Sequence, residues 1–238
     1  MRVIGIDYSG AATDDTPLAG LAAWMASTSR VMPVTRTQEP GPARSWSRNA
    51  LTERLAQEME SGACLVVIDH AFAYSAEALD KLKVRAWDDL PGRLDRLGSL
   101  SALRDRVGHV AGWRLADLAA PGTQDPLGVR TFRPVSHSTF HGIRQLGRLR
   151  GLADFHLWPF DGWRPKSGRS VVAEGFPNLL RRRVATTAAT RDERDAEALA
   201  RFFWQRWRGK VLGQLFEPAL TGTEKAPARR EGWILGVG

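Results

Sequence analysis

Three short apolar segments of the sequence each end in an acidic residue: Asp7, Asp69 and Glu174. Apolar runs of this length are typical of strands that are buried on both faces of a sheet. A carboxylate at the tip of a buried strand is costly to leave unpaired, so each of the three needs a cation or hydrogen-bond donors.

Two further acids belong to the strongest helical pattern in the chain, residues 191–208, in which apolar residues recur every three to four positions. Asp192 and Asp195 continue this apolar stripe toward the start of the helix, so we expect both to point at the sheet. For Asp192 the alternative is a capping role, because acids are favoured in the first turn of any helix.

Several carboxylates at one edge of a sheet repel one another unless cations lie between them. Mg²⁺ and Mn²⁺ prefer oxygen ligands, and two such ions can activate water and stabilise the leaving oxygen in phosphodiester cleavage. The sequence therefore predicts one or two Mg²⁺ or Mn²⁺ ions at a catalytic site. Its expected ligands are Asp7, Asp69, Glu174 and Asp195, with Asp192 as a further candidate. For Glu174 an ion pair with an arginine such as Arg181 is the alternative.

Candidate substrate-binding residues lie next to these acids. Ser9 and Gly10 follow Asp7 in a turn that would let a ligand approach the backbone. His70 follows Asp69 and could move protons, or it could be a structural histidine. Arg181 opens a run of three arginines that could hold phosphates, or that could line a solvated helix face.

The elements that position the acids follow from the pattern of apolar and turn residues. Residues 18–25 and 30–37 are predicted to complete a three-stranded antiparallel meander, with Pro33 placing its strand at the edge. A helix over residues 47–60 then forms a crossover, so strand 64–68 should lie parallel to the first strand. Asp7 and Asp69 would then share the carboxyl edge, where open α/β sheets bind ligands.

The remaining segments are predicted as follows: mostly helix over 72–110 with a break at Pro91-Gly92, irregular structure over 112–134, a helix over 137–150, a strand over 153–159, a short helix through 179–184, a polar connection over 217–230 and a closing strand over 232–237. We expect one α/β domain over residues 1–238, with a largely helical and irregular insertion around 72–150.

Composition limits the class of protein. The 238 residues are 43% hydrophobic, which is enough for a packed core, and the net charge of +8 suits a polyanionic partner such as DNA or RNA. A genomic base composition that favours arginine over lysine is the alternative source of that charge. The single cysteine, Cys64, excludes an intrachain disulfide and a cysteine-rich zinc site. No apolar run is as long as a membrane span, so we expect a cytoplasmic protein without a membrane partner; its oligomeric state stays open.

The chain resembles a bacterial and archaeal family of predicted nucleases, domain-of-unknown-function family 429, in six segments that run from end to end: GIDYSGA, VVIDHAF, WPFDG, VVAEGFP, RDERDAEALA and EGWILGV. The resemblance implies an RNase H-like fold, a mixed sheet of five or more strands whose first three are antiparallel. It also implies an acidic site at Asp7, Asp69, Glu174 and Asp195, in which the first-strand aspartate bridges two divalent ions and the final-helix aspartate completes the site. Asp192 has no firm counterpart in the family pattern.

Three functions therefore compete. The first is a metal-dependent nuclease. The second is a non-catalytic RNase H-like scaffold that binds nucleic acid or protein, although a binder of polyanions gains nothing from clustered carboxylates. The third is a nucleotide phosphotransferase of the actin and sugar-kinase type, which also begins with a strand that ends in Asp. Against it, a second phosphate loop and an adenosine-binding glycine-rich segment are not evident in the sequence.

Overall fold

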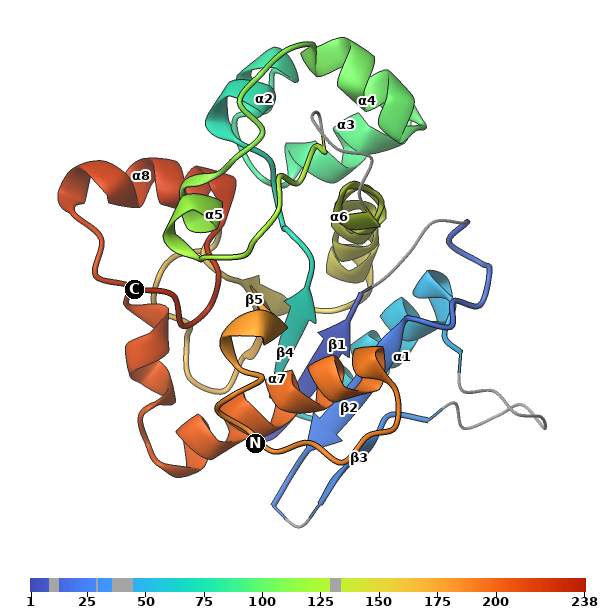
Figure 1. Ribbon diagram of the computed structural model, residues 1–238, viewed down its shortest axis with the longest axis vertical. Coiled ribbons are helices and arrows are strands. Elements are labelled where there is room, and N and C mark those ends of the chain that lie inside the picture. The colour runs from blue at the N-terminus through green and yellow to red at the C-terminus, as the bar shows by residue number, and fades with distance from the viewer. Residues whose placement is uncertain (9–12, 29, 36–44, 129–133) are drawn as a thin grey trace.

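A six-stranded mixed sheet forms the centre of the computed structural model (Figure 1). The structure describes residues 1–8, 13–28, 30–35, 45–128 and 134–238. Across the sheet the strands run in the order β3-β2-β1-β4-β6-β5. Their bounds are Arg2–Asp7 (β1), Ala22–Ala26 (β2), Val31–Pro33 (β3), Cys64–Asp69 (β4), Phe155–Leu157 (β5) and Ser170–Glu174 (β6).

The predicted meander and crossover are both confirmed. β1, β2 and β3 pair antiparallel, and β3, which ends in Pro33, is the edge strand, where a missing backbone N–H breaks no ladder. Helix α1 (Arg48–Glu60) follows, and the side chain of Ser47 caps it by accepting a hydrogen bond from the Ala50 amide at 3.2 Å. The chain then enters β4, which pairs parallel to β1.

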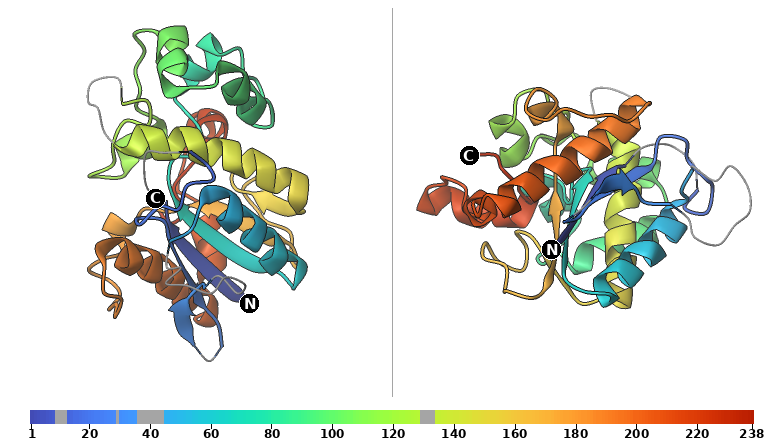
Figure 2. Two further views of the ribbon diagram at one scale, coloured as in Figure 1. Left: turned by 90° about the vertical axis from the view of Figure 1, so that its right-hand side faces the viewer. Right: turned by 90° about the horizontal axis from the view of Figure 1, so that it is seen from below.

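Side chains alternate between the two faces of the sheet, and different helices cover each face. Ile4 and Ile6 of β1 belong to the core that contains α1 and α6 (Pro134–Leu152), whereas Val3 belongs to the core that contains α7 (Arg191–Arg208). Figure 2 shows α7 across one face of the sheet, with α1 and α6 on the other. The alternation of side chains along a strand therefore decides which helix each strand residue contacts.

Gly5 lets α7 lie directly on β1. A Cβ atom at Gly5 would be 2.2 Å from the Ala196 carbonyl oxygen and 2.5 Å from the Ala200 amide nitrogen, both in the backbone of α7. Only a residue without a side chain allows this approach. The contact brings the first turns of α7, which carry Asp192 and Asp195, over the end of β1.

In the described part of the chain between β4 and α6 lie the helices α2 (Ala76–Lys81), α3 (Asp89–Leu97), α4 (Leu100–Val107) and α5 (Leu115–Ala119). The predicted break at Pro91-Gly92 is wrong, because Pro91 lies in the first turn of α3, where a backbone N–H has no partner within the helix. The helix ends instead at Gly98, whose φ of 73° is left-handed. The stretch 112–134 was expected to be irregular, yet it contains α5 and the start of α6.

The C-terminal segment differs from the sequence prediction. The prediction of a polar connection over 217–230 is wrong, because helix α8 (Gly222–Glu231) occupies most of that stretch. The helix begins with a capping box between Thr221 and Glu224. The expected closing strand is reduced to one parallel bridge between Ile234 and Glu174. Two 3₁₀ segments complete the structure: η1 (Pro177–Leu179), shorter than the helix expected there, and η2 (Leu212–Phe216). Of the described helices, none has the length and apolar character needed to cross a membrane.

Candidate functional site

Asp7 and Asp69 are neighbours at the carboxyl edge of the sheet. They are register partners on the adjacent parallel strands β1 and β4 (Figure 1). Asp69 follows Leu65 and Val67 at intervals of two, and both of these residues belong to the core on the α7 side. Asp7 follows Val3 and Gly5 in the same way. The register and the alternation thus place both carboxylates on one face, under α7.

No described residue donates a hydrogen bond to either carboxylate. Asp7 is 9% exposed and Asp69 is half-buried, and within the part of the chain that the structure describes neither side chain accepts a hydrogen bond. Burial raises the pKa of Asp7, and the charges of Asp69, Asp192 and Asp195 raise it further. Burial likewise raises the pKa of Asp69, with contributions from Asp195 and Glu174. Protons or a cation must therefore offset the negative charge at this edge.

Asp195 joins this acidic cluster but is held by an arginine. It is 4% exposed, and its two oxygens accept hydrogen bonds from Arg181 Nε at 2.7 Å and Nη2 at 2.5 Å. The positive charge of the Arg181 guanidinium opposes the increase in the pKa values of Asp7 and Asp69. It therefore acts on all three carboxylates. Asp192 is half-buried, and its pKa is raised by burial and by Asp195.

The Glu174 side chain starts from the other face of the sheet because its strand is offset by one residue. Its register partner on β4 is Ile68 rather than Asp69, so the alternation turns Glu174 to the opposite face of the sheet. There it accepts hydrogen bonds from Arg114 Nη1 at 2.7 Å and Nη2 at 2.6 Å and from the Phe72 amide at 3.1 Å. The cation that pairs with Glu174 is therefore Arg114, not the Arg181 that the sequence offered as its alternative partner.

Arg114 was not identified from the sequence, although it is the most heavily bonded cation near the site. It is 1% exposed and also donates to both oxygens of Asp117, at 3.0 and 2.8 Å. The available signal was the Arg-x-x-Asp spacing from Arg114 to Asp117, which lies inside a stretch without apolar periodicity. The pair anchors the start of α5 against the end of β6.

His70 packs as a neutral imidazole. Burial lowers its pKa to about 4, and Nδ1 donates to the Ala71 carbonyl at 2.9 Å. A Cβ atom at Gly142 of α6 would be 2.4 Å from Nε2, so the ring lies directly against that helix. These contacts fit a structural histidine better than a proton carrier. Ser9 and Gly10, the other predicted substrate-binding residues near Asp7, lie outside the described residues.

The acids border a cavity of about 210 Å³. Asp7, Asp69 and Glu174 line it from the sheet, and Arg114 and Asp117 line it from the segment before α6. The cavity gives small molecules or the end of a polymer access to the carboxylates. Its charged lining among the described residues consists of four acids, Asp7, Asp69, Asp117 and Glu174, and of Arg114, which is paired with Glu174 and Asp117.

A divalent cation fits Asp7 and Asp69, whose carboxylate oxygens have no hydrogen-bonding partner among the residues that the structure describes. The fit is limited to these two, because among the described residues no group of three or more His, Cys, Asp or Glu side chains is placed to hold a metal ion. Asp195 could become a third ligand only by exchanging Arg181 for the cation. The site must be interpreted from this geometry, since no family model, curated protein or solved structure matches the chain.

Proposed function

We propose that the protein is a divalent-metal-dependent nuclease of the RNase H-like fold, which hydrolyses phosphodiester bonds of DNA or RNA with one or two Mg²⁺ or Mn²⁺ ions. The observation that carries this proposal is the pair Asp7 and Asp69. They are adjacent on parallel strands, lie on the same face, and accept no hydrogen bond from any described residue. Two adjacent carboxylates in this arrangement, one buried and one half-buried, favour a hard divalent cation over any neutral ligand.

The sheet supports the same proposal. Three antiparallel strands are followed by parallel strands, the first strand ends in Asp7, and α7 carries Asp195 to the same face. This is the arrangement that the resemblance to the predicted nuclease family implies. Glu174 departs from that pattern, because Arg114 already binds both of its carboxylate oxygens.

The residues of the chain divide the work between binding and charge balance. Asp7 and Asp69 would hold the first cation, and Asp195 would join them when Arg181 releases it. A bound divalent ion would polarise a phosphoryl oxygen and lower the pKa of a water molecule beside it. Arg181, once released, can donate both of its hydrogen bonds to a phosphate group, since guanidinium binds phosphate and carboxylate with the same fork geometry.

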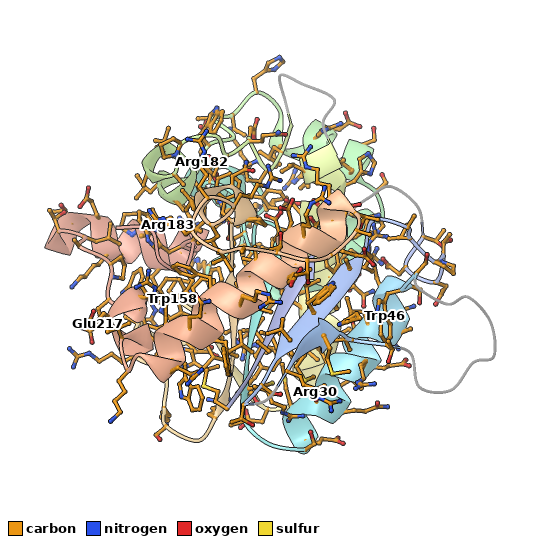
Figure 3. The ribbon with its side chains drawn as sticks, turned by 60° about the horizontal axis from the view of Figure 1, so that its bottom comes forward. Arg30, Trp46, Trp158, Arg182, Arg183 and Glu217 are labelled. Atoms are coloured by element: carbon orange, nitrogen blue, oxygen red, sulfur yellow. The ribbon has the colours of Figure 1, made fainter. Side chains whose placement is uncertain are left out.

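Two more arginines extend this positive charge. Arg182 and Arg183 are exposed on the segment between η1 and α7, and neither forms an ion pair with a described residue (Figure 3). They follow Arg181 directly, so a phosphate backbone bound at Arg181 can continue past them. Such contacts attract nucleic acid without reading its sequence.

A nuclease assay tests the proposal. Labelled single- and double-stranded DNA and RNA are incubated with the protein in Mn²⁺, Mg²⁺ or EDTA. We expect cleavage of at least one substrate in metal alone, with none in EDTA and none from Asp7→Asn or Asp69→Asn. Asp105→Asn is the matched control, because Asp105 is exposed on α4, away from the carboxyl edge. Full activity of Asp7→Asn would refute the assignment.

The second candidate function is a non-catalytic scaffold that binds nucleic acid or protein. The two bidentate arginine–carboxylate pairs favour it, because Arg181 and Arg114 already bind Asp195 and Glu174, two of the four acids, without metal. A scaffold of this kind would bind oligonucleotides equally well in EDTA and in Mn²⁺ and would cleave none of them. Parallel binding and cleavage assays on the same oligonucleotides separate the two functions.

A further inference from the structure

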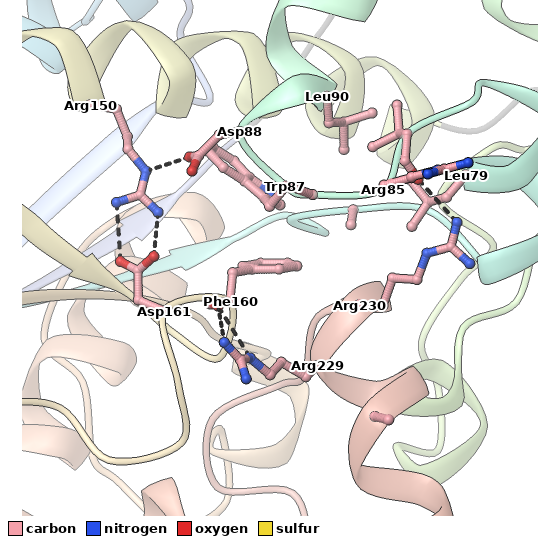
Figure 4. Close-up of a pocket in the computed structure, with 14 residues that line it drawn as sticks. Leu79, Arg85, Trp87, Asp88, Leu90, Arg150, Phe160, Asp161, Arg229 and Arg230 are labelled. Carbon is pink, nitrogen blue, oxygen red and sulfur yellow. Dashed lines mark hydrogen bonds and ion pairs between the residues drawn. The ribbon is translucent and has the colours of Figure 1, made fainter.

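A second cavity, of about 430 Å³, shares no lining residue with the cavity at Asp7 and Asp69. It lies between residues 84–90, the turn that follows β5, and helix α8 (Figure 4). Its volume is within the range of about 300–1,000 Å³ that is typical of small-molecule sites. The nuclease proposal assigns no role to it.

The floor of the second cavity is apolar and aromatic. Trp87 is 8% exposed, and its indole Nε1 donates to the Phe72 carbonyl at 2.8 Å, which fixes the ring. The Phe160 ring lies 5.6 Å from it, centroid to centroid, and Leu79 and Leu90 are buried beside them. A floor of this kind favours a flat apolar group, because aromatic rings stack on one another.

One wall of the cavity is charged but internally paired. Arg150 donates to both oxygens of Asp161, at 3.0 and 2.7 Å, and forms an ion pair with Asp88 at 3.0 Å. Its guanidinium carbon lies 5.6 Å from the centre of the Trp87 ring. This wall therefore holds the indole in place and leaves little charge for a ligand.

Two further arginines, on opposite sides of the cavity, have no carboxylate partner among the described residues (Figure 4). Arg229 donates only to the Phe160 carbonyl, at 3.3 and 3.2 Å, and Arg85 is exposed; within the described chain neither of them has an acidic partner. Arg230, which is paired with Asp80, also donates to the carbonyl of Val84 at 3.0 Å and so lies next to Arg85. Four arginines and two aspartates line the cavity, so positive charge is in excess around it.

We propose that this cavity binds a small organic anion in which a planar ring carries a phosphate group, with a nucleoside monophosphate as the test ligand. The ring would lie against Trp87 and Phe160, and the phosphate would accept hydrogen bonds from Arg85 on one side of the cavity or from Arg229 on the other (Figure 4). Arginine suits this role because its planar fork binds phosphate oxygens in pairs. The site needs no metal, so it stands or falls independently of the nuclease proposal.

Calorimetric titration with adenosine 5′-monophosphate in EDTA tests the inference. We expect saturable binding to the wild type and to Asp7→Asn, and a loss of affinity of about tenfold or more in the double variant Arg85→Gln/Arg229→Gln. Ala226→Trp should also abolish binding, because Ala226 lines the cavity from an exposed position on α8 and an indole there fills it. Arg30→Gln is the matched control, since Arg30 is an exposed arginine at the opposite edge of the sheet and should bind like the wild type.

Adenosine and inorganic phosphate separate the two parts of the ligand, and each should bind more weakly than the monophosphate. If inorganic phosphate binds as tightly as the monophosphate, the aromatic floor contributes nothing to binding, and the proposal is overturned. Unchanged affinity in both the double variant and Ala226→Trp would place the ligand elsewhere. An absence of binding at millimolar concentration would also overturn it. Circular dichroism of each variant confirms that it is folded.

Discussion

Asp7 and Asp69 stand side by side in register at the ends of β1 and β4, on the face of the sheet that α7 covers. The pairing is a consequence of the βαβ crossover through α1, which brings the carboxyl ends of two parallel strands to one edge. Two carboxyl groups are held there without hydrogen-bond donors from the described residues. The proposed function depends on this relationship, and it has consequences for stability as well as for metal binding.

The metal-free protein should lose stability as the pH rises from about 5 to 8. The pKa of Asp7 in the folded state is raised above its ordinary value of 3.8, which applies to the unfolded state. At a pH between the ordinary and the raised pKa, the folded state therefore keeps a proton that the unfolded state has released. Stability is therefore greatest at the acid end of this window, falls as the pH rises, and levels off above the folded-state pKa. Asp7→Asn should flatten this dependence and melt at a higher temperature than the wild type at pH 8.

Thermal melting in EDTA over that pH range measures the effect. Asp105→Asn serves as the control, because it removes an exposed aspartate and should keep the slope of the wild type. If the stability of Asp7→Asn and that of the wild type changed equally with pH, the carboxyl groups at this edge would not repel one another, and the case for a cation there would fail.

Arg181→Gln should weaken the metal-free protein and strengthen Mn²⁺ binding. Without the guanidinium, Asp195 loses both of its hydrogen bonds from Arg181, and the acidic edge loses a nearby positive charge. We expect a loss of about 1–3 kcal/mol in unfolding free energy in EDTA. We also expect Mn²⁺ to bind about tenfold more tightly, as a change of 1.4 kcal/mol would give. Arg182→Gln, one residue away and without an ion pair among the described residues, should change neither quantity; weaker Mn²⁺ binding by Arg181→Gln would contradict the competition between arginine and metal.

Arg114→Met should destabilise the fold strongly. It leaves Glu174 and Asp117 buried without the cation that binds both, and breaking a buried pair in this way costs about 3–5 kcal/mol. Urea denaturation measures the loss. The double variant Arg114→Met/Glu174→Gln should recover part of it, because one unpaired charge is removed. A double variant no more stable than the single one would show that Arg114 acts through packing alone.

Gly5→Ala should destabilise the protein by about 3 kcal/mol, because the new methyl group meets the backbone of α7 and forces the helix away from β1. The same shift would move Asp195 away from Asp7, so Mn²⁺ affinity should fall as well. Gly151→Ala is the matched control, since Gly151 lies in the last turn of α6 with open space around it and should gain up to about 1 kcal/mol. Equal melting temperatures for the two variants would argue against the close approach.

The sheet could be predicted from the sequence because its strands are apolar runs with clear boundaries. The helical crossover through α1 then fixes the adjacency of Asp7 and Asp69. The side that Glu174 faces could not be predicted, because it depends on a register offset of one residue between β4 and β6, and a pattern of acids at strand ends does not encode that offset.

The other elements that the sequence analysis missed have few apolar residues to reveal them. α8 is polar, contains Pro227, and buries only Ala228 and Glu231, so it shows no apolar stripe. Arg114 lies in a stretch without periodicity, and its importance comes from partners 60 residues away in β6. Contacts of this kind follow from the tertiary fold and not from local pattern.

Calorimetric titration of Mn²⁺ into the wild type and Asp7→Asn, at pH 8 in matched buffer, tests the central claim most directly. We predict saturable binding by the wild type, accompanied by proton release, because the ion displaces protons from carboxyl groups whose pKa values are raised. In Asp7→Asn the binding should disappear while the protein stays folded. Equal heats from the two proteins, or no binding by either, would contradict a metal centre at Asp7 and Asp69.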